Sequence, residues 1–226
     1  METIIAVNQL CKSYLSGGQS LRVLDHIDLQ VRRGDFISLM GPSGSGKSTF
    51  LNIIGTMDAP DSGEIVIAGQ NVTRMPETQL ALFRQKHIGF VFQFHYLLPE
   101  FTIEENVAMP LMIGGTRRPE ALKTAREILD YLGVADRGHH YPAEISGGEK
   151  QRAVVGRALI NRPDILLADE PTGNLDKKSG QRMLELFKKI QKDFSQTFFL
   201  VTHDEHIAAI ADINYQLDNG KLSKII

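Results

Sequence analysis

The chain has 226 residues and a mass of 25.2 kDa, which suits one large domain or a domain that carries an inserted lobe. Hydrophobic residues make up 42% and charged residues 23%, a balance that favours a folded globular protein, and the formal net charge of −2 argues against a broad nucleic-acid surface. The longest run free of Lys, Arg, Asp and Glu, residues 87–99, is too short to cross a bilayer, and the chain starts without a secretory signal, so a cytosolic protein is expected.

The first 75 residues read mostly as strands. Runs of branched aliphatic residues alternate with Gly, Ser and Asp, which is typical of strands joined by turns, and Gly17-Gly18 marks the first turn. Strands are predicted at residues 4–10, 23–31, 36–40, 64–68 and 88–92, and helices at residues 47–57 and 77–86.

The middle of the chain, residues 93–160, has a helical pattern with one apolar stripe formed by Leu122, Ala125, Ile128, Leu129 and Leu132. Beyond it, strands are expected at 165–168, 198–201 and 213–217, and helices at 178–192 and 205–211. Strand–helix alternation with continuous apolar strands indicates an α/β fold whose parallel sheet is covered on both faces. We therefore expect one domain, 1–226, in which an α/β core with a β-rich N-terminal part (1–92 and 161–226) carries an inserted helical lobe (93–160).

Residues 41–48, Gly-Pro-Ser-Gly-Ser-Gly-Lys-Ser, fit the pattern G-x-x-x-x-G-K-[ST] between a predicted strand and a predicted helix. The glycines let successive backbone N–H groups point into one concavity, and the following helix adds its positive end, which together suit polyphosphate oxygens. In this interpretation Lys47 reaches the β- and γ-phosphates and Ser48 ligates Mg²⁺. A Gly/Ser-rich turn that happens to contain lysine is the alternative, and the strand–loop–helix setting disfavours it.

Two acids, Asp169 and Glu170, follow the buried strand at 165–168. Ligands of doubly wound sheets bind at the carboxyl ends of the strands, so these acids are expected beside the phosphate loop. Asp169 is placed to hold Mg²⁺, and Glu170 to polarise an attacking water. A solvated pair of acids at a strand end is the alternative.

Together with the phosphate loop and the two acids, further motifs make the chain resemble the ATP-binding-cassette ATPases over nearly its whole length. Residues 145–149, Ile-Ser-Gly-Gly-Glu, resemble the family's LSGGQ signature, and residues 174–176, Asn-Leu-Asp, its D-loop. Gln93 stands at the place of the Q-loop glutamine, His203 at that of the switch histidine, and Tyr14 at that of an aromatic that stacks on adenine. The resemblance implies the P-loop ATPase fold of this family, with a RecA-like core, an antiparallel N-terminal β subdomain and an inserted helical lobe.

The resemblance also implies that two copies associate head to tail and enclose ATP between them. Glu170 is then the general base, assisted by Lys47, His203 and Gln93, and Mg²⁺ is held by Ser48, Gln93 and Asp169. The residues implied in ATP binding are Tyr14, Gly41, Pro42, Ser43, Gly44, Ser45, Gly46, Lys47, Ser48 and Thr49, with Ser146, Gly147 and Gly148 reaching the nucleotide from the second copy.

Some of these residues also have simpler explanations. Ser146-x-x-Glu149 is a capping box that starts a helix, and the same exposed helix end can bind an anion. Glu149 departs from the family's glutamine, and we expect its charge to point away from phosphate. Tyr14 could serve only in packing, and His203 could be an ordinary residue beside a helix cap. The other six histidines show no metal-ligand spacing, and Cys11, the single cysteine, excludes a disulfide framework and a cysteine-rich zinc site.

Residues 92–111 are most similar to the ATPases of lipoprotein-releasing systems, although MacB-type efflux and FtsE-type cell-division ATPases share much of the motif set. This similarity implies transmembrane permease subunits of the LolC/LolE kind, and a peripheral position at the cytoplasmic face of the inner membrane with contact only through those partners. The apolar cluster Phe94, Tyr96, Leu97, Leu98 and Phe101 is either a partner surface or lobe core.

Two other classes of protein share parts of this pattern. A soluble cassette ATPase of DNA repair or translation would have a coiled-coil insertion or a second cassette, and neither is in the sequence. A small phosphotransferase kinase would lack the Ser-Gly-Gly element. The resemblance therefore favours a transport ATPase over both alternatives.

Overall fold

The computed structural model describes residues 2–225, so Met1 and Ile226 of the expected domain lie outside it. Its N-terminal sheet is antiparallel, with strand order β2-β1-β4-β5. The first two strands form a hairpin that turns at Gly17-Gly18, where φ is 58° and 81°, as expected from the glycine pair. The strands are β1 (Thr3–Ser16), β2 (Gln19–Arg32), β4 (Ser62–Ile67) and β5 (Gln70–Asn71).

The second sheet has six strands in the order β10-β9-β3-β8-β7-β6. Its strands are parallel from β9 to β6, and β10 joins β9 in the antiparallel sense. Alternate residues of β8 enter separate cores, because Phe198 and Leu200 face one and Phe199 and Val201 the other. Both faces are therefore covered, as the apolar strands predicted. The strands are β3 (Phe36–Met40), β6 (Ile88–Phe92), β7 (Ile165–Asp169), β8 (Thr197–Val201), β9 (Ile213–Asp218) and β10 (Lys221–Ile225).

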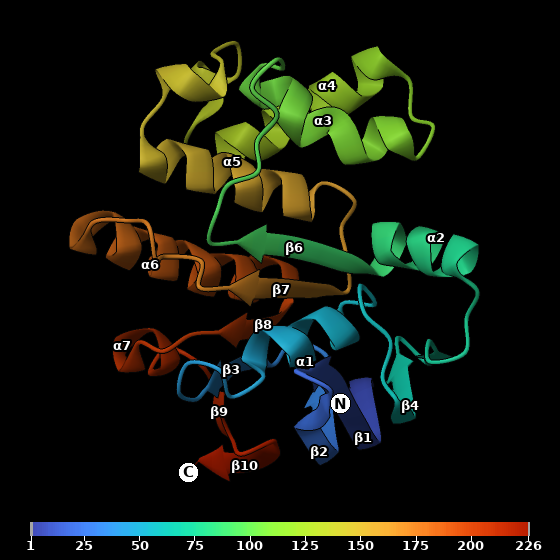
Figure 1. Cartoon of the computed structure of the whole chain (residues 1–226). Coiled ribbons are helices and arrows are strands. Elements are labelled where there is room, and N and C mark those ends of the chain that lie inside the picture. The colour runs from blue at the N-terminus through green and yellow to red at the C-terminus, as the bar shows by residue number, and fades with distance from the viewer. Residues whose placement is uncertain (1, 226) are drawn as a thin grey trace.

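Helices pack on both faces of this sheet (Figure 1). From α1 (Lys47–Ile54), the Phe50 ring meets Phe199 at a centroid distance of 5.9 Å, and from α6 (Lys177–Phe194), Phe187 meets Phe198 at 5.3 Å. All four rings are fully buried. Since truncating such a ring to alanine costs about 3–5 kcal/mol, these pairs hold α1 and α6 against the two faces of β8.

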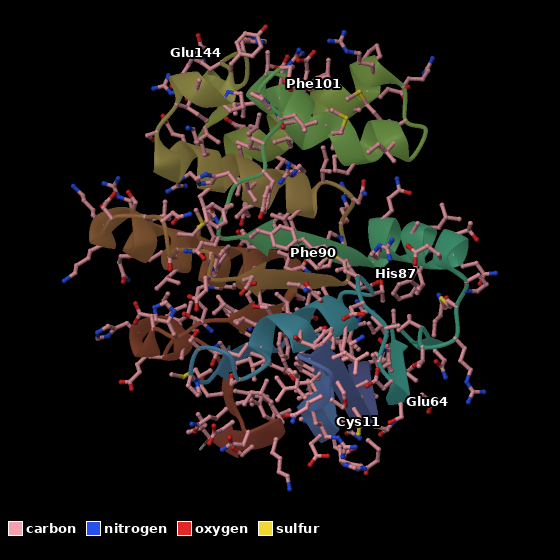
Figure 2. All side chains as sticks on the ribbon, viewed as in Figure 1. Cys11, Glu64, His87, Phe90, Phe101 and Glu144 are labelled. Carbon is pink, nitrogen blue, oxygen red and sulfur yellow. The ribbon has the colours of Figure 1, made fainter. Side chains whose placement is uncertain are left out.

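The helical lobe consists of α3 (Ile103–Ile113), α4 (Arg118–Tyr131) and α5 (Gly147–Leu159), with short turns η1 (Ala135–Arg137) and η2 (Pro142–Glu144). It lies on the opposite side of the parallel sheet from the N-terminal sheet (Figure 1), and Phe101 lies in it (Figure 2). The predicted stripe faces its core: Ala125, Leu129 and Leu132 are buried, and Ile128 is partly buried. The helix α2 (Glu77–His87) leads into β6.

Several predicted boundaries were wrong. The helix α1 ends at Ile54 instead of residue 57, because Thr56 has a left-handed φ of 57° and the Met57 N–H donates to the Asn52 carbonyl, five residues back. The helix α7 (Glu205–Ala208) stops short of residue 211, since the amides of Ile210 and Ala211 bond only three residues back. The strands β1 and β2 extend beyond the predicted 4–10 and 23–31, because the hairpin also pairs exposed polar residues.

The strand β10 was not predicted at all. It pairs with β9 across Asn219-Gly220, two residues with φ of 47° and 74°. Asn-Gly is the strongest short signal for a two-residue hairpin, so this dipeptide was the available clue. No helix among residues 2–225 is both long enough and apolar enough to span a membrane.

Candidate active site

The phosphate loop joins the end of β3 to the start of α1, which begins at Lys47 with Gly46 as its N-cap. Glycine is required at both ends of the loop. A Cβ on Gly41 would lie 2.2 Å from the Leu217 carbonyl oxygen, and one on Gly46 would lie 2.7 Å from Val23 Cγ1. The loop is therefore pressed against β9 and β2, and its path leaves no room for side chains there.

Two side chains of the loop have uncommon surroundings. The Lys47 ammonium donates to the carbonyl oxygens of Gly41 and Pro42, each at 2.9 Å, so the side chain folds over the start of the loop. Ser45 Oγ is buried and has no hydrogen-bond partner among the described residues. Since buried polar atoms are rarely left unpaired, a ligand oxygen suits this position.

The predicted acids lie beside the loop. Asp169 ends β7, and burial raises the pKa of its carboxyl group, while the neighbouring Ser48 hydroxyl and Lys47 ammonium oppose that rise. The Glu170 charge adds to it. The structure thus brings Lys47, Ser48, Asp169 and Glu170 together, as expected from the topology of parallel strands.

Glu170 is held in place by the segment that follows β8. Its backbone has a φ of 44°, a left-handed conformation that is uncommon for this residue type, and its N–H donates to the Val201 carbonyl at 2.9 Å. Its carboxylate accepts from the Thr202 hydroxyl at 3.2 Å and the His203 N–H at 2.9 Å, and lies 2.6 Å from His203 Nδ1. The Glu170 side chain is only 17% exposed, whereas His203 is 76% exposed. The carboxylate is thus fixed, and the imidazole beside it faces solvent.

Gln93, the first residue after β6, contacts the segment after β7. Its carbonyl accepts from Asn174 Nδ2 at 2.8 Å, and its own amide lies 3.5 Å from Asn174 Oδ1. A Cβ on Gly173 would lie 2.8 Å from the Gln93 amide nitrogen, so glycine permits this approach. The predicted Q-loop and D-loop residues are therefore joined within one chain. The expected role of Gln93 toward Mg²⁺ stays a prediction.

Ser146 is the N-cap of α5, and the predicted capping box is present. The Glu149 carboxylate accepts from Ser146 N at 2.8 Å and Ser146 Oγ at 2.7 Å, and Arg137 Nε donates to it at 2.8 Å. Arg137 first and then Ser146 lower the pKa of Glu149 to about 2. Its charge is turned back onto the cap and onto Arg137, which confirms the predicted capping box. Its direction relative to a bound phosphate stays a prediction.

Replacing Glu149 tests this cap. Glu149→Ala should lower the free energy of unfolding by about 1 kcal/mol, hence Tm by about 2–4 °C at neutral pH, because the cap amide loses its acceptor. Glu149→Gln keeps an acceptor oxygen, so its free energy of unfolding should fall by less than that of Glu149→Ala. Since the folded pKa is depressed, the stabilisation is present above about 4.5 and is lost as the pH falls toward about 2. Thermal unfolding against pH is the measurement, and a wild-type-to-alanine difference that does not shrink over that range would contradict the assignment.

The glycines of the signature have few neighbours in their own chain. The nearest atom to a Cβ built on Gly147 is Leu175 Cδ2 at 3.9 Å, and for Gly148 it is Ser179 Oγ at 3.5 Å. Both are ordinary contact distances, and neither neighbour belongs to the phosphate loop. Packing within this chain therefore does not require glycine at either position.

Tyr14 lies on β1, where its hydroxyl donates to Asp58 Oδ2 at 2.6 Å and the Lys12 ammonium lies 5.0 Å from its ring centre. Partial burial, and then the Asp58 carboxylate, raise the pKa of Tyr14. A cavity of about 340 Å³ beside the phosphate loop is lined by β2 residues, among them Arg22, and by the β9–β10 turn, and Tyr14 is not among the described residues that line it. Stacking of Tyr14 on adenine stays a prediction.

Sequence reasoning missed some contacts around the site. Arg157 of α5 donates to the carbonyls of Tyr96 at 2.6 Å and His95 at 2.9 Å, which ties the segment after the Q-loop to the signature helix. The conclusion that the remaining histidines have no metal-ligand arrangement is corrected for His26, whose ring lies with Cys11 and Asp25 in a group that could hold a metal ion.

Comparison with known proteins now decides the family. Residues 24–173 match the family described as ABC transporter. The chain belongs to this family. It is accordingly an ATPase of the cassette type, and the P-loop ABC ATPase fold predicted from sequence is confirmed.

Individual members of the ABC transporter family are similar over almost the whole chain. The lipoprotein-releasing system ATP-binding protein LolD of Bacteroides fragilis (strain YCH46) is 52% identical over 203 residues, covering 90% of this chain and 94% of that protein. The protein of the same name from Shewanella sp. (strain MR-4) is 44% identical, covering 99% and 97%. The ATP-binding cassette MJ0796, in a dimeric post-hydrolysis state bound to ADP and Pi, superimposes with a TM-score of 0.89 at 36% identity and 99% coverage of both chains.

Proposed function

We propose that this chain is the ATP-hydrolysing subunit of a lipoprotein-releasing transporter, which acts as a head-to-tail dimer at the cytoplasmic face of the inner membrane. The observation that carries the proposal is its similarity, between 43% and 52% identity, to proteins named as LolD over at least 90% of the chain. Its partners are permease subunits of the LolC/LolE kind, through which alone it contacts the membrane.

The phosphate loop binds the triphosphate of ATP. Backbone N–H groups of residues 43–48, the start of α1 and the Lys47 ammonium supply positive potential, and the Ser45 hydroxyl, unpartnered among the described residues, can donate to a phosphate oxygen. The ammonium leaves the carbonyls of Gly41 and Pro42 in exchange for phosphate oxygens, which are stronger acceptors because they are charged.

A magnesium ion suits the same place. The Ser48 hydroxyl and the Asp169 carboxylate are hard oxygen ligands side by side, and burial already destabilises the charged form of Asp169, which a cation would relieve. These two residues, with Gln93 from the Q-loop, would hold the ion. When bound, it would neutralise charge on the phosphates.

Hydrolysis then requires a base and an in-line water. Glu170, fixed by Thr202 and His203, accepts a proton from water as the oxygen attacks the γ-phosphate. The solvent-facing imidazole of His203 lies against the same carboxylate and can donate to the γ-phosphate oxygens. Lys47 stabilises the charge that collects on the transferred group.

The signature completes the site from a second copy of the chain. Glycine near the start of a helix costs up to about 1 kcal/mol against alanine, and no close contact among residues 2–225 requires it at Gly147 or Gly148. Bare backbone at a capped helix end suits a phosphate of an ATP held by the partner. ATP thereby joins the two copies, and its hydrolysis removes the contacts that the γ-phosphate makes with both.

Force would pass to the permease through the segment after the Q-loop. Phe94 and Tyr96 are 61% and 64% exposed, and Leu98 and Phe101 also reach the surface. Exposed aromatic residues in a group are typical of a protein interface. Arg157 of α5 is hydrogen-bonded to this segment, so a displacement of the segment by the permease would also move the signature helix.

Isolation from the native membrane tests the proposal. The tagged chain should co-purify with two integral permease subunits, and the reconstituted complex should release a lipoprotein from proteoliposomes when given ATP. Phe94→Ala with Tyr96→Ala should weaken permease binding at least about 10-fold. Leu82→Ala, which removes a similarly exposed side chain from α2, is the matched control and should bind normally.

The identity of the co-purifying proteins separates the alternatives. Capture of an efflux permease would favour a MacB-type role, and capture of division proteins an FtsE-type role. Recovery of the chain alone, with no integral partner, would instead favour a soluble cassette ATPase.

A further inference from the structure

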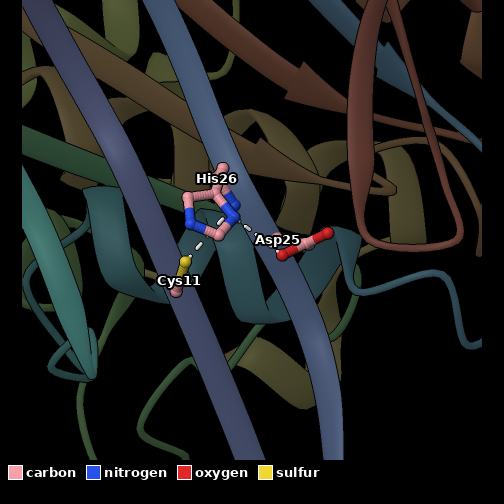
Figure 3. Close-up of side chains that lie close together, drawn as sticks. All are labelled: Cys11, Asp25 and His26. Atoms are coloured by element: carbon pink, nitrogen blue, oxygen red, sulfur yellow. Dashed lines mark hydrogen bonds and ion pairs between the residues drawn. The ribbon is translucent and has the colours of Figure 1, made fainter.

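We propose a second metal site, for a thiophilic divalent cation such as Zn²⁺, formed by Cys11, Asp25 and His26 on the N-terminal hairpin. One ligand atom from each residue, Cys11 Sγ, an Asp25 carboxylate oxygen and a His26 ring nitrogen, lies within 4.8 Å of the other two (Figure 3). The cluster lies in the N-terminal sheet, and none of the three residues belongs to the nucleotide site described above.

A β-bulge creates this cluster. In the pairing of β1 with β2, Leu10 faces Ile27 and Lys12 faces Leu24, so that Cys11 alone stands opposite both Asp25 and His26. Consecutive side chains of a regular strand point to opposite faces, and they could not both meet one partner. The bulge, with His26 at a φ of 53°, turns both toward Cys11.

The contacts within the cluster suit a bound cation. The His26 backbone N–H donates to Cys11 Sγ at 3.3 Å, and His26 Nδ1 lies 2.8 Å from Asp25 Oδ1. The Asp25 backbone N–H donates to the Gly220 carbonyl at 2.8 Å and so anchors its strand. Cys11 is buried, whereas the His26 side chain is 58% exposed, so a cation can enter from solvent.

The chemistry of the three groups points to zinc or a similar ion. Thiolate, imidazole and carboxylate are the ligand types of Zn²⁺, and three protein ligands leave a fourth position for water. Mg²⁺, which prefers oxygen ligands alone, would not compete well here. On binding, the Cys11 thiol releases its proton to solvent, and the neutral His26 ring coordinates through one nitrogen while the other carries its proton.

One neighbour opposes the cation. Arg22 Nη1 donates to the same Asp25 oxygen at 3.0 Å, and its positive charge repels a metal ion. The Arg22 side chain is 58% exposed and can move away. This predicts that Arg22→Ala tightens metal binding, a result that a purely structural role of the cluster would not produce.

Cobalt absorption tests the site, because this chain has one cysteine and any thiolate-to-cobalt charge-transfer band must come from Cys11. Full-length protein, stripped of metal with a chelator and kept in excess Mg²⁺, should give this band with one equivalent of Co²⁺, and Zn²⁺ should displace it. The Co²⁺ affinity should fall at least about 10-fold in His26→Ala and in Asp25→Asn, and should rise in Arg22→Ala. Asp169→Asn, at the nucleotide site, should leave the band unchanged.

Thermal unfolding supplies a second measurement. Because the site joins β1 to β2, Zn²⁺ at about 100 times its dissociation constant should raise Tm by about 5–10 °C in the wild type and not in Cys11→Ser. Absence of the cobalt band would overturn the proposal. It would also be overturned if the band kept its full affinity in both His26→Ala and Asp25→Asn, since the thiol would then be binding alone.

Discussion

Glu170→Gln is expected to bind ATP with near wild-type affinity and to hydrolyse it about 10²–10⁴-fold more slowly. The amide cannot take a proton from water, so the chemical step loses its base. The substitution should be well tolerated, because the amide oxygen can still accept from the His203 N–H, 2.9 Å from Glu170 Oε1. The amide NH2, in the place of Oε2, can donate to the Thr202 hydroxyl oxygen, which lies 3.2 Å away. Binding and single-turnover hydrolysis, measured on the same preparation, separate the two effects.

The same variant should accumulate as an ATP-bound dimer. If ATP joins two copies and hydrolysis separates them, a slow chemical step leaves the closed state populated, and light scattering with ATP should report twice the monomer mass. Adding Ser146→Arg to Glu170→Gln should keep the protein monomeric, since a long cationic side chain at the α5 cap blocks the approach of a second copy. ATP binding by the monomer should survive in this double variant.

Glu205→Gln is the matched control for charge removal near the same loop, because Glu205 is an exposed acid at the start of α7. It should hydrolyse ATP at the wild-type rate. Wild-type turnover in Glu170→Gln would remove Glu170 from the role of base. If Glu170→Gln turns over slowly but forms no dimer at saturating ATP, the role of Glu170 as general base would stand. The proposal that ATP joins the two copies would be wrong.

Residues close together in the chain were predictable because short-range chemistry places them. The phosphate loop needs only a strand, a glycine-rich turn and a helix start, and the capping box needs only a serine and a glutamate three residues apart. Cap chemistry even gave the direction of the Glu149 side chain, which the hydrogen bonds to Ser146 confirm. Asp169 and Glu170 followed from one further rule, that parallel strands present their carboxyl ends at one edge.

Contacts between distant residues were not predictable, because they depend on strand register and tertiary packing. The bulge that places Cys11 opposite Asp25 and His26 depends on the register in which β1 pairs with β2. The sequence pattern of either strand alone does not indicate it. The bonds from Arg157 to the carbonyls of His95 and Tyr96 join elements 61 and 62 residues apart. An arginine on a predicted helix carries no signal of such a partner.

Lys47→Ala is expected to weaken ATP binding by about 2–4 kcal/mol, roughly 30- to 1000-fold in the dissociation constant. The charged Nζ lies at the phosphate loop itself, where it donates to the carbonyls of Gly41 and Pro42. Isothermal calorimetry with ATP at low and high salt measures the loss. Because the contribution is electrostatic, the difference from wild type should narrow as salt rises. Lys86→Ala, which removes an exposed lysine from α2, should bind ATP normally.

A structural role for Lys47 predicts a different outcome. If its ammonium served only to tie the carbonyls of Gly41 and Pro42, Lys47→Ala would lower Tm and leave the affinity of the folded protein for ATP unchanged. If it serves the phosphates, removing it should change Tm little without nucleotide, since the two carbonyls can bond water at the loop surface. ATP would then stabilise the wild type by far more than it stabilises the variant. Thermal unfolding with and without ATP therefore distinguishes a Lys47 that stabilises the loop from a Lys47 that binds the phosphates of ATP.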